Sequence, residues 1–182
     1  DLGRYKIMDT CIKPFAAHAL SQGVIQAAID VVAAHRIDAA RIAAVELRYP
    51  APVLALPSMD PEKLNPRNKE TADHSPPYLA AMGLLFGACG PAQFTPRCLD
   101  APAVWRLIEC TRIVADPALD AAWPHTMAGG IRVTLQDGAV HESVCRYPPG
   151  HPRNRLDDAA VERKFRAYTD GVLDSQIGRA HV

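Results

Sequence analysis

A dense polar segment that leads directly into an apolar run is the feature that most constrains this chain. Residues 69–78 read Lys-Glu-Thr-Ala-Asp-His-Ser-Pro-Pro-Tyr, and the apolar run 79–89 follows. Proline suits the first helical position and keeps the preceding residue out of the helical region, so we predict a helix that begins at Pro77 with Tyr78 in its first turn. Its core-facing stripe is formed by apolar residues at three- and four-residue steps, namely Leu79, Met82, Leu85, Phe86 and Cys89. The polar N-terminal end of a buried helix is therefore a candidate functional site.

Hydrophobic spacing elsewhere alternates between strand and helix periods. Period two predicts strands over 4–13 and 41–49, and a short apolar strand over 111–115. A two-residue turn at Asp137-Gly138 predicts a hairpin of 131–136 and 139–147, which pairs Val140 with Leu135 and Val144 with Ile131. Helical spacing predicts helices over 18–35 and 103–110 and another from Asp157 onward, while 50–68 reads as a long surface loop. This mixture without strict alternation favours an α+β fold with a mostly antiparallel small sheet and packed helices.

Composition excludes several functional classes. The 182 residues are 48% hydrophobic, and 20 Lys plus Arg balance 20 Asp plus Glu. Such a chain can bury a core, and it has no net charge that would attract nucleic acid or an anionic membrane. The longest apolar run is too short to span a bilayer, and the first residues do not resemble a signal peptide, so we expect a cytoplasmic protein.

Sequence motifs for nucleotide, zinc-protease and α/β-hydrolase sites do not occur in the chain. Four residues could be imagined as a metal site, but their spacing fits no standard ligand pattern, and we expect no metal: His125, His141, Cys145 and His151.

Both ends of the chain look artificial. The polar-apolar alternation of 2–13 begins abruptly, as if an earlier part preceded it. Residues 176–182 end in Ile-Gly-Arg-Ala-His-Val, which resembles a translated sequencing adaptor and is expected to be a non-native tail.

Five segments carry a resemblance, in this order along the chain: 13–18, 70–78, 137–138, 149–154 and 164–165. Together they resemble the MmgE/PrpD family, which contains 2-methylcitrate dehydratases and cis-aconitate decarboxylases. Residues 13–18, Lys-Pro-Phe-Ala-Ala-His, are similar to the family's Lys-x-aromatic-Pro segment that leads into a helix. Residues 70–78 resemble its most specific signature. The Asp137-Gly138 hairpin, the loop 149–154 (Pro-Gly-His-Pro-Arg-Asn) and Lys164-Phe165 resemble its late hairpin, loop and helix. Two departures are Ala16 and Arg155, which stand where the family commonly has proline.

The resemblance implies a cofactor-independent lyase built from a large helical domain and a smaller α+β lid domain. Residues 1–155 would be the lid-type domain, and the helix within 156–175 would belong with the helical domain, whose earlier sequence is not part of this chain. The implied partners are a small tricarboxylate substrate, the helical domain and a second copy in a homodimer, with no nucleic acid and no membrane. The implied reaction is dehydration of 2-methylcitrate or a related hydroxy-tricarboxylate, and the alternatives are a cis-aconitate-type decarboxylase or a non-catalytic binding or assembly domain.

The resemblance places Lys13 and Tyr78 at catalytic positions, with His74 as a third catalytic candidate and Arg67 and Ser75 as substrate-binding candidates. Dehydration removes a proton next to a carboxylate while the leaving hydroxyl is protonated. A lysine can stabilise the developing negative charge, a tyrosine can donate a proton, and histidine has an unperturbed pKa near neutrality.

Each of these residues also has an ordinary structural interpretation. Without the resemblance, Lys13 would be a strand-end surface lysine, Tyr78 a half-buried residue of a first turn, and His74 a polar residue beside a helix. His18 and His35 read as helix-surface groups rather than ligands.

Overall fold

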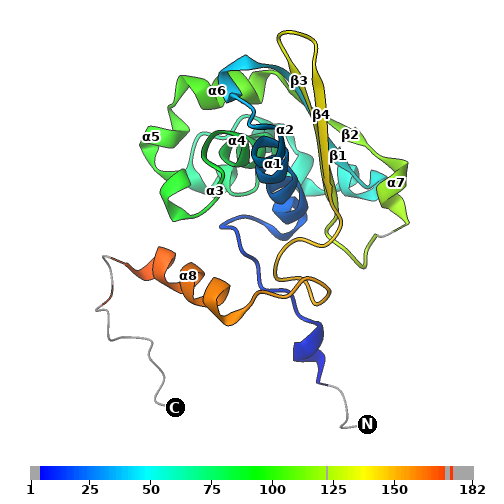
Figure 1. Ribbon diagram of the computed structural model, residues 1–182, viewed down its shortest axis with the longest axis vertical. Coiled ribbons are helices and arrows are strands. Elements are labelled where there is room, and N and C mark those ends of the chain that lie inside the picture. Colours follow the sequence, from blue (N-terminus) through cyan, green and yellow to red (C-terminus); the bar gives the residue numbers. More distant parts are fainter. Residues whose placement is uncertain (1–4, 122, 171–172, 174–182) are drawn as a thin grey trace.

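A four-stranded mixed sheet lies at one side of the body, to the right of the larger helices in Figure 1. The structure is a computed structural model that describes residues 5–121, 123–170 and 173. The strand order is β2-β1-β3-β4, and the strands are β1 (Ile42–Tyr49), β2 (Thr111–Ala115), β3 (Gly129–Leu135) and β4 (Val140–Cys145). β1 and β2 are parallel, while the β1–β3 and β3–β4 pairs are antiparallel. The predicted α+β class and mostly antiparallel sheet are confirmed.

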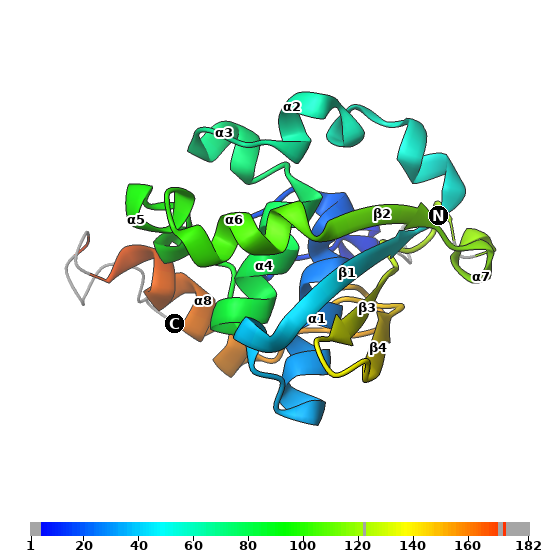
Figure 2. The same cartoon turned by 90° about the horizontal axis from the view of Figure 1, so that it is seen from above.

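Helices cover one face of the sheet (Figure 2). α1 (Gln22–His35) packs against β3, β4 and α4 (Pro76–Phe86), and α6 (Pro102–Glu109) packs against α4 and β1. Short helices complete this layer: α2 (Pro61–Leu64), α3 (Lys69–Ala72), α5 (Pro96–Leu99) and α7 (Pro117–Asp120). The core lies between this layer and the inward sheet face, where Val45, Leu47, Ile131 and Val133 are at most 1% exposed.

The other sheet face is polar and carries a row of alternating charges. Arg112, Glu46, Arg132 and Glu142 are successive partners across the four strands, from β2 to β4. Arg112 pairs with Glu46 at 2.5 Å, and Arg132 pairs with Glu142 at 2.5 Å. Opposite charges on directly paired strand positions stabilise a sheet modestly. This face of the sheet is therefore suited to contact with solvent.

The predicted hairpin register is wrong by one residue. The loop has three residues: the Gly138 N–H donates to the Leu135 carbonyl at 2.9 Å, and the Leu135 N–H donates to the Ala139 carbonyl at 2.8 Å. Gly138 has a φ of +84°, which three-residue hairpin loops of this kind require. Val140 and Val144 therefore pair with Thr134 and Gly130 instead. Because a one-residue shift turns every side chain to the opposite face, both valines are exposed on the outer face.

Two other predictions also need correction. The described part of the predicted strand 4–13 has no strand: Lys6–Asp9 is a 3₁₀ turn and no residue of 5–13 is buried. Alternation alone does not make a strand, because a strand needs a neighbour that satisfies its backbone hydrogen bonds. α4 begins at Pro76 rather than Pro77, since Ser75 is its N-cap. This helix is also buried nearly all round, and Phe86 of the predicted stripe is 48% exposed.

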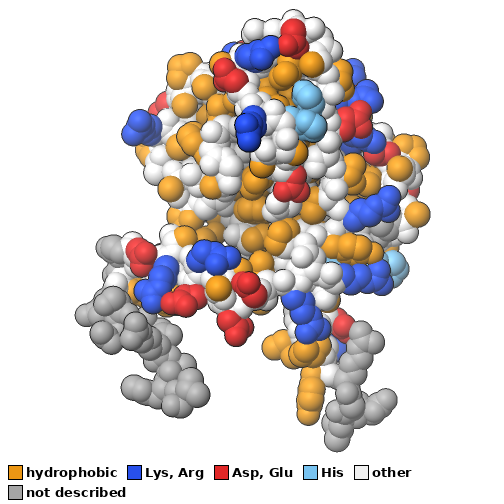
Figure 3. All heavy atoms as spheres, viewed as in Figure 1, with side chains coloured by type: hydrophobic (Ala, Val, Ile, Leu, Met, Phe, Trp, Pro, Cys, Tyr) orange, Lys and Arg blue, Asp and Glu red, His pale blue; other side chains and the backbone are white. Residues whose placement is uncertain are grey.

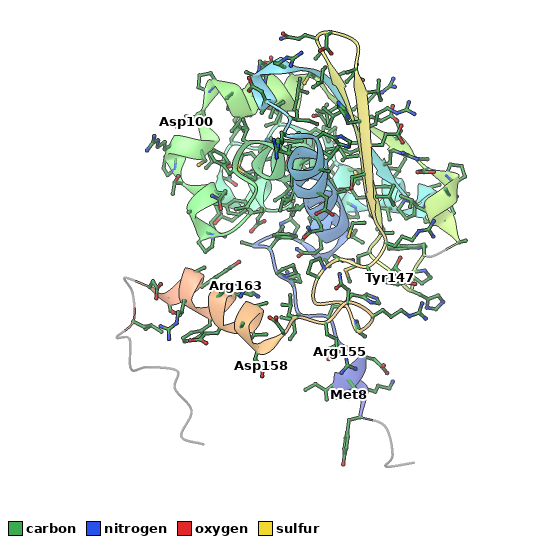
Figure 4. All side chains as sticks on the ribbon, in the orientation of Figure 1. Met8, Asp100, Tyr147, Arg155, Asp158 and Arg163 are labelled. Carbon is green, nitrogen blue, oxygen red and sulfur yellow. The ribbon has the colours of Figure 1, made fainter. Side chains whose placement is uncertain are left out.

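The final helix lies apart from the body, at the lower left of Figure 1. α8 (Asp158–Thr169) begins where predicted, because the Asp157 carboxylate accepts the Ala160 N–H at 2.7 Å. Figure 4 labels Asp158 at its start and Arg163 in its middle. Val161, Phe165 and Tyr168 of its predicted apolar stripe are about 40% exposed. Val172, the last residue of that stripe, and the tail 176–182 lie outside the described residues.

Candidate functional site

A cavity of about 490 Å³ lies where four segments distant in sequence meet. The segment before α1, the end of α3, the 3₁₀ turn Pro91–Phe94 and α8 all contribute to it. Its lining contains two histidines, a carboxylate, three lysines and apolar residues: Lys13, Phe15, Ala16, Ala17, His18, Lys69, Asp73, His74, Pro91, Phe94, Lys164 and Tyr168. Two of the predicted site residues, Lys13 and His74, are among them.

The loop that carries Lys13 is held by a buried glutamine. Gln22, the first residue of α1, is 2% exposed. Its side-chain oxygen accepts the Phe15 N–H at 3.2 Å, and its amide nitrogen donates to the carbonyls of Ala17 at 3.1 Å and His18 at 3.3 Å. A fully bonded buried amide fixes the conformation of the segment around it. The sequence between Lys13 and α1 is therefore a shaped loop.

The backbone around Lys13 is held by hydrogen bonds to two later segments of the protein. The N–H of the preceding residue, Ile12, donates to the Gly150 carbonyl at 2.9 Å, and the Lys164 ammonium donates to the Lys13 carbonyl at 2.7 Å. The Lys13 ammonium donates to the Ala17 carbonyl at 2.9 Å. Within the described residues Lys13 has no carboxylate partner at ion-pair distance, so its charge is available to an anion in the cavity.

His74 reaches the cavity because it lies in the short link between α3 and α4. Asn68 caps α3 by accepting the Thr71 N–H at 2.9 Å, and α3 ends just before Asp73. The Asp73 carboxylate forms a short contact with Nδ1 of His74 and an ion pair with Lys69 at 3.4 Å. A carboxylate on Nδ1 favours the tautomer with its proton there, which leaves Nε2 of His74 as the basic nitrogen.

His18 completes the cluster, although the sequence interpretation treated it as a surface group. Its ring stacks on that of His74 with centroids 5.3 Å apart, and its backbone N–H donates to the Asp73 carbonyl at 3.0 Å. Burial, and then the nearby His74 and Lys13, lower the pKa of His18 to about 4, against a weaker opposite effect of Asp73. His18 is therefore neutral at pH 7. Its place at the end of the 13–18 segment was the sequence signal that could have identified it.

Tyr78 and Ser75 lie behind the cavity rather than in its lining. Ser75 is fully buried, and its hydroxyl accepts the Tyr78 N–H at 3.3 Å as the α4 cap. Tyr78 is 0% exposed and its hydroxyl donates to the Gln93 carbonyl at 2.5 Å. Its ring lies 5.8 Å from that of Phe94, which does line the cavity. Burial raises the pKa of the Tyr78 phenol, with smaller contributions from Cys98 and Cys89.

Arg67 lies away from the cavity lining. Its guanidinium lies 4.7 Å from the centroid of the Trp105 ring, and its backbone N–H donates to the Thr71 hydroxyl at 3.2 Å. Its observed contacts are thus a cation–π pair and a hydrogen bond beside α3. The structure brings together Lys13, His74 and His18 in the cavity lining, whereas Arg67, Ser75 and Tyr78 lie outside it.

The charge of the lining favours a small anion. Among the described lining residues, Lys13, Lys69 and Lys164 oppose the single carboxylate of Asp73. Cations in a partly enclosed cavity attract negative ligands more strongly than the same cations on an open surface. A small polycarboxylate therefore suits this cavity by charge.

A larger hollow, of about 610 Å³, lies near α7 and β4 but offers less chemistry. Its most buried charges, Arg48 and Asp116, pair with each other at 2.6 Å, and Arg48 also pairs with Glu142 at 2.9 Å. Their charges are thus largely compensated. No group of three or more metal-ligating side chains occurs among the described residues, and none of the described helices is long and apolar enough to cross a membrane.

Comparisons with known proteins agree with the segments that carry the resemblance. The chain is 30% identical over 175 residues to the 2-methylcitrate dehydratase of Cupriavidus necator, an alignment that covers 90% of this chain and 35% of that protein. It is 31% identical over 125 residues to the cis-aconitate decarboxylase-like protein oryM of Aspergillus oryzae (strain ATCC 42149 / RIB 40), covering 69% of this chain and 25% of that protein. The chain thus spans about a quarter to a third of the length of these relatives. A model of the MmgE/PrpD C-terminal domain matches residues 15–181. This chain therefore belongs to the MmgE/PrpD family.

Proposed function

We propose that the chain is the C-terminal domain of a cofactor-independent lyase that dehydrates 2-methylcitrate or a related hydroxy-tricarboxylate. The observation that carries the proposal is the convergence of Lys13, His18 and His74 on one cationic cavity. The similarity to a named 2-methylcitrate dehydratase over 90% of the chain supports the same reaction class.

The proposed roles follow from the contacts. The Lys13 ammonium binds a substrate carboxylate and stabilises the charge that builds on it as the neighbouring carbon loses a proton. His74, oriented by Asp73, accepts that proton at Nε2. Lys164 and Lys69 hold the remaining carboxylates at the cavity wall.

Tyr78 remains a predicted proton donor to the leaving hydroxyl. In the structure its hydroxyl donates to Gln93, so this role requires the turn Pro91–Phe94 to shift and release it. Arg67 and Ser75 stay predicted substrate-binding residues, and each would have to move to reach a ligand, since neither lines the cavity.

A cis-aconitate-type decarboxylation is the second candidate, favoured by the similarity to a protein named cis-aconitate decarboxylase-like. The same cationic cavity would stabilise the charge left when a carboxylate departs as carbon dioxide. A substrate panel of 2-methylcitrate and cis-aconitate with a complete-length enzyme separates the two reactions. A non-catalytic assembly domain is the third candidate, and unchanged kcat/KM in both Lys13→Ala and Tyr78→Phe would favour it.

Ligand binding by the 182-residue chain tests the site directly. We expect 2-methylcitrate and cis-aconitate to shift the NMR signals of His18 and His74, and Lys13→Ala to weaken this binding about tenfold or more. Lys6→Ala is the matched control, because Lys6 is exposed in the same segment but does not line the cavity. Equal binding by both variants would contradict the assignment of Lys13. We also expect no turnover by this chain alone, and turnover would refute a site shared with the family's helical domain.

A further inference from the structure

A chain of hydroxyl groups leads from His18 into the core. His18 Nε2 lies 2.6 Å from the Ser21 hydroxyl oxygen, which lies 3.0 Å from the Tyr49 hydroxyl oxygen. Ser21 and Tyr49 are both 0% exposed. The three residues come from the loop before α1, the start of α1 and the end of β1, so this series of hydrogen bonds connects the cavity to the sheet.

Ser21 occupies a helix N-cap without acting as a cap. A serine at this position ordinarily accepts a backbone N–H of the first turn, but the Ser21 side chain makes no such hydrogen bond. Its hydroxyl is instead committed to His18 and Tyr49. Ser21 also ends the 3₁₀ turn Ala19–Ser21 and has helical dihedral angles, so the backbone is already helical before α1 and the hydroxyl is available for these two bonds.

The direction of the hydrogen bonds follows from the buried tyrosine. Among the described residues, Ser21 is the one acceptor within reach of the Tyr49 hydroxyl, so Tyr49 donates to Ser21. The Ser21 hydrogen is then free to point at His18, where Nε2 must accept it. The reverse direction would leave the buried Tyr49 hydrogen without an acceptor, which disfavours it by about tenfold to a hundredfold.

We propose that Tyr49 and Ser21 are positioning residues that hold His18 as a neutral imidazole with its proton on Nδ1, so that His18 donates a hydrogen bond to the ligand and does not act as a base. Nδ1 has no partner among the described residues, and His18 lines the cavity. Charged and titratable groups around this ring are Lys13, His74, Asp73, Lys69 and Lys164. The excess of cations over Asp73 further opposes a second proton on the ring.

Two stacked imidazoles would thus have opposite roles. His74 is bound through Nδ1 to a carboxylate and keeps a basic Nε2, whereas His18 is bound through Nε2 to a hydroxyl and presents Nδ1–H. Different surroundings of neighbouring titratable groups are a general way of separating a base from a hydrogen-bond donor. The inference deepens the proposed function, because it assigns the part that His18 plays in the same cavity.

Nitrogen-15 NMR of the imidazole rings in the 182-residue chain tests the tautomer without any ligand. At pH 7 we expect the Nδ1 of His18 to be protonated and its Nε2 to be unprotonated. In Tyr49→Phe the Ser21 hydroxyl can either donate to His18 or accept from it. We therefore expect the ratio of Nδ1-protonated to Nε2-protonated His18 to fall by about tenfold or more. Tyr147→Phe removes a hydroxyl that accepts from Arg153 elsewhere and should leave the ratio unchanged.

Each result decides the question. Protonated Nε2 in the wild-type chain overturns the proposal, and it does so even if Tyr49→Phe fails to fold. An unchanged tautomer ratio in a folded Tyr49→Phe overturns the role of Tyr49. Ser21→Ala removes both hydrogen bonds and tests the same series of hydroxyls a second time. Because no substrate is used, a wrong lyase proposal would leave the tautomer result intact, and a wrong tautomer would leave ligand binding by Lys13 intact.

Discussion

His18 links the cavity to the stability of the fold. Its folded pKa of about 4 lies below the ordinary histidine value of 6.5, so the unfolded chain binds the proton more readily. The contribution of His18 to stability is therefore present above pH 6.5 and is lost as the pH falls toward 4. From the two pKa values this loss amounts to about 3 kcal/mol at most. We expect the free energy of unfolding, from urea titrations, to fall less steeply over this interval in His18→Gln than in the wild type. Parallel pH profiles would contradict a buried, neutral His18.

Residue identities alone identified part of the site. Lys13 and His74 were predicted and line the cavity, whereas His18 was read as a surface group because its stacking on His74 joins segments more than fifty residues apart. The sequence also could not show that Ser75 is used as a helix cap or that the Tyr78 hydroxyl is bonded to Gln93. Local chemistry thus suggests candidates, while tertiary contacts decide which of them face the ligand.

At the scale of elements, the α1–α4 contact depends on a glycine. A Cβ on Gly83 would lie 2.9 Å from the Ala28 Cβ and 3.1 Å from the Ile25 carbonyl oxygen. Gly83→Ala gains about 1 kcal/mol of helix propensity but overpacks the contact by about 1–3 kcal/mol, so we expect net destabilisation by urea titration. The control is Gly90→Ala, whose Cβ would meet ordinary contacts at 3.7 Å and should change stability by less than about 0.5 kcal/mol. A stabilised Gly83→Ala would show that the helices separate easily.

A second glycine positions the Lys13 segment. Gly150 has a φ of +85°, and a Cβ there would lie 1.8 Å from the Ile12 carbonyl oxygen. We expect Gly150→Ala to displace Ile12 and Lys13 and to weaken polycarboxylate binding about tenfold, measured by calorimetry. Gly138→Ala is the matched control, because Gly138 has a φ of +84° but open space around it. It shares the backbone strain without the clash, so equal loss of binding in both variants would contradict this role of Gly150.

Elements with a strong local signal were predicted well. Helices 18–35 and 103–110 and strands 41–49 and 111–115 correspond to α1, α6, β1 and β2 within a few residues. The hairpin register failed because the turn dipeptide does not reveal that Gln136 joins the loop. The segment 5–13 failed because its alternation finds no neighbouring strand. Both failures concern pairing between segments, which periodicity within one segment does not encode.

At the scale of the whole molecule, apolar side chains gather where the body ends. Tyr5 and Ile7 are 70% and 76% exposed on the segment that projects at the lower right of Figure 3. Met8 and Arg155, labelled in Figure 4, line a hollow of about 170 Å³ between this segment and the loop before α8. Exposed apolar groups on two adjoining segments are typical of a surface that packs against another domain. We propose that this surface meets the helical domain of a complete-length enzyme, which would close the cavity.

Phe165 tests whether the apolar side of α8 belongs to the same domain contact, because it is apolar and 42% exposed on that helix. In the 182-residue chain, Phe165→Glu should lower the melting temperature only modestly, since the side chain is already 42% exposed. In a complete-length enzyme the same change would bury a carboxylate at the domain contact and should lower stability and turnover markedly. Arg163→Glu, on the opposite side of α8 and exposed, introduces the same side chain and should affect neither protein strongly. Equally small effects of the two substitutions in the longer protein would mean that the apolar side of α8 contacts nothing there, and the cavity would then have to be closed by other residues.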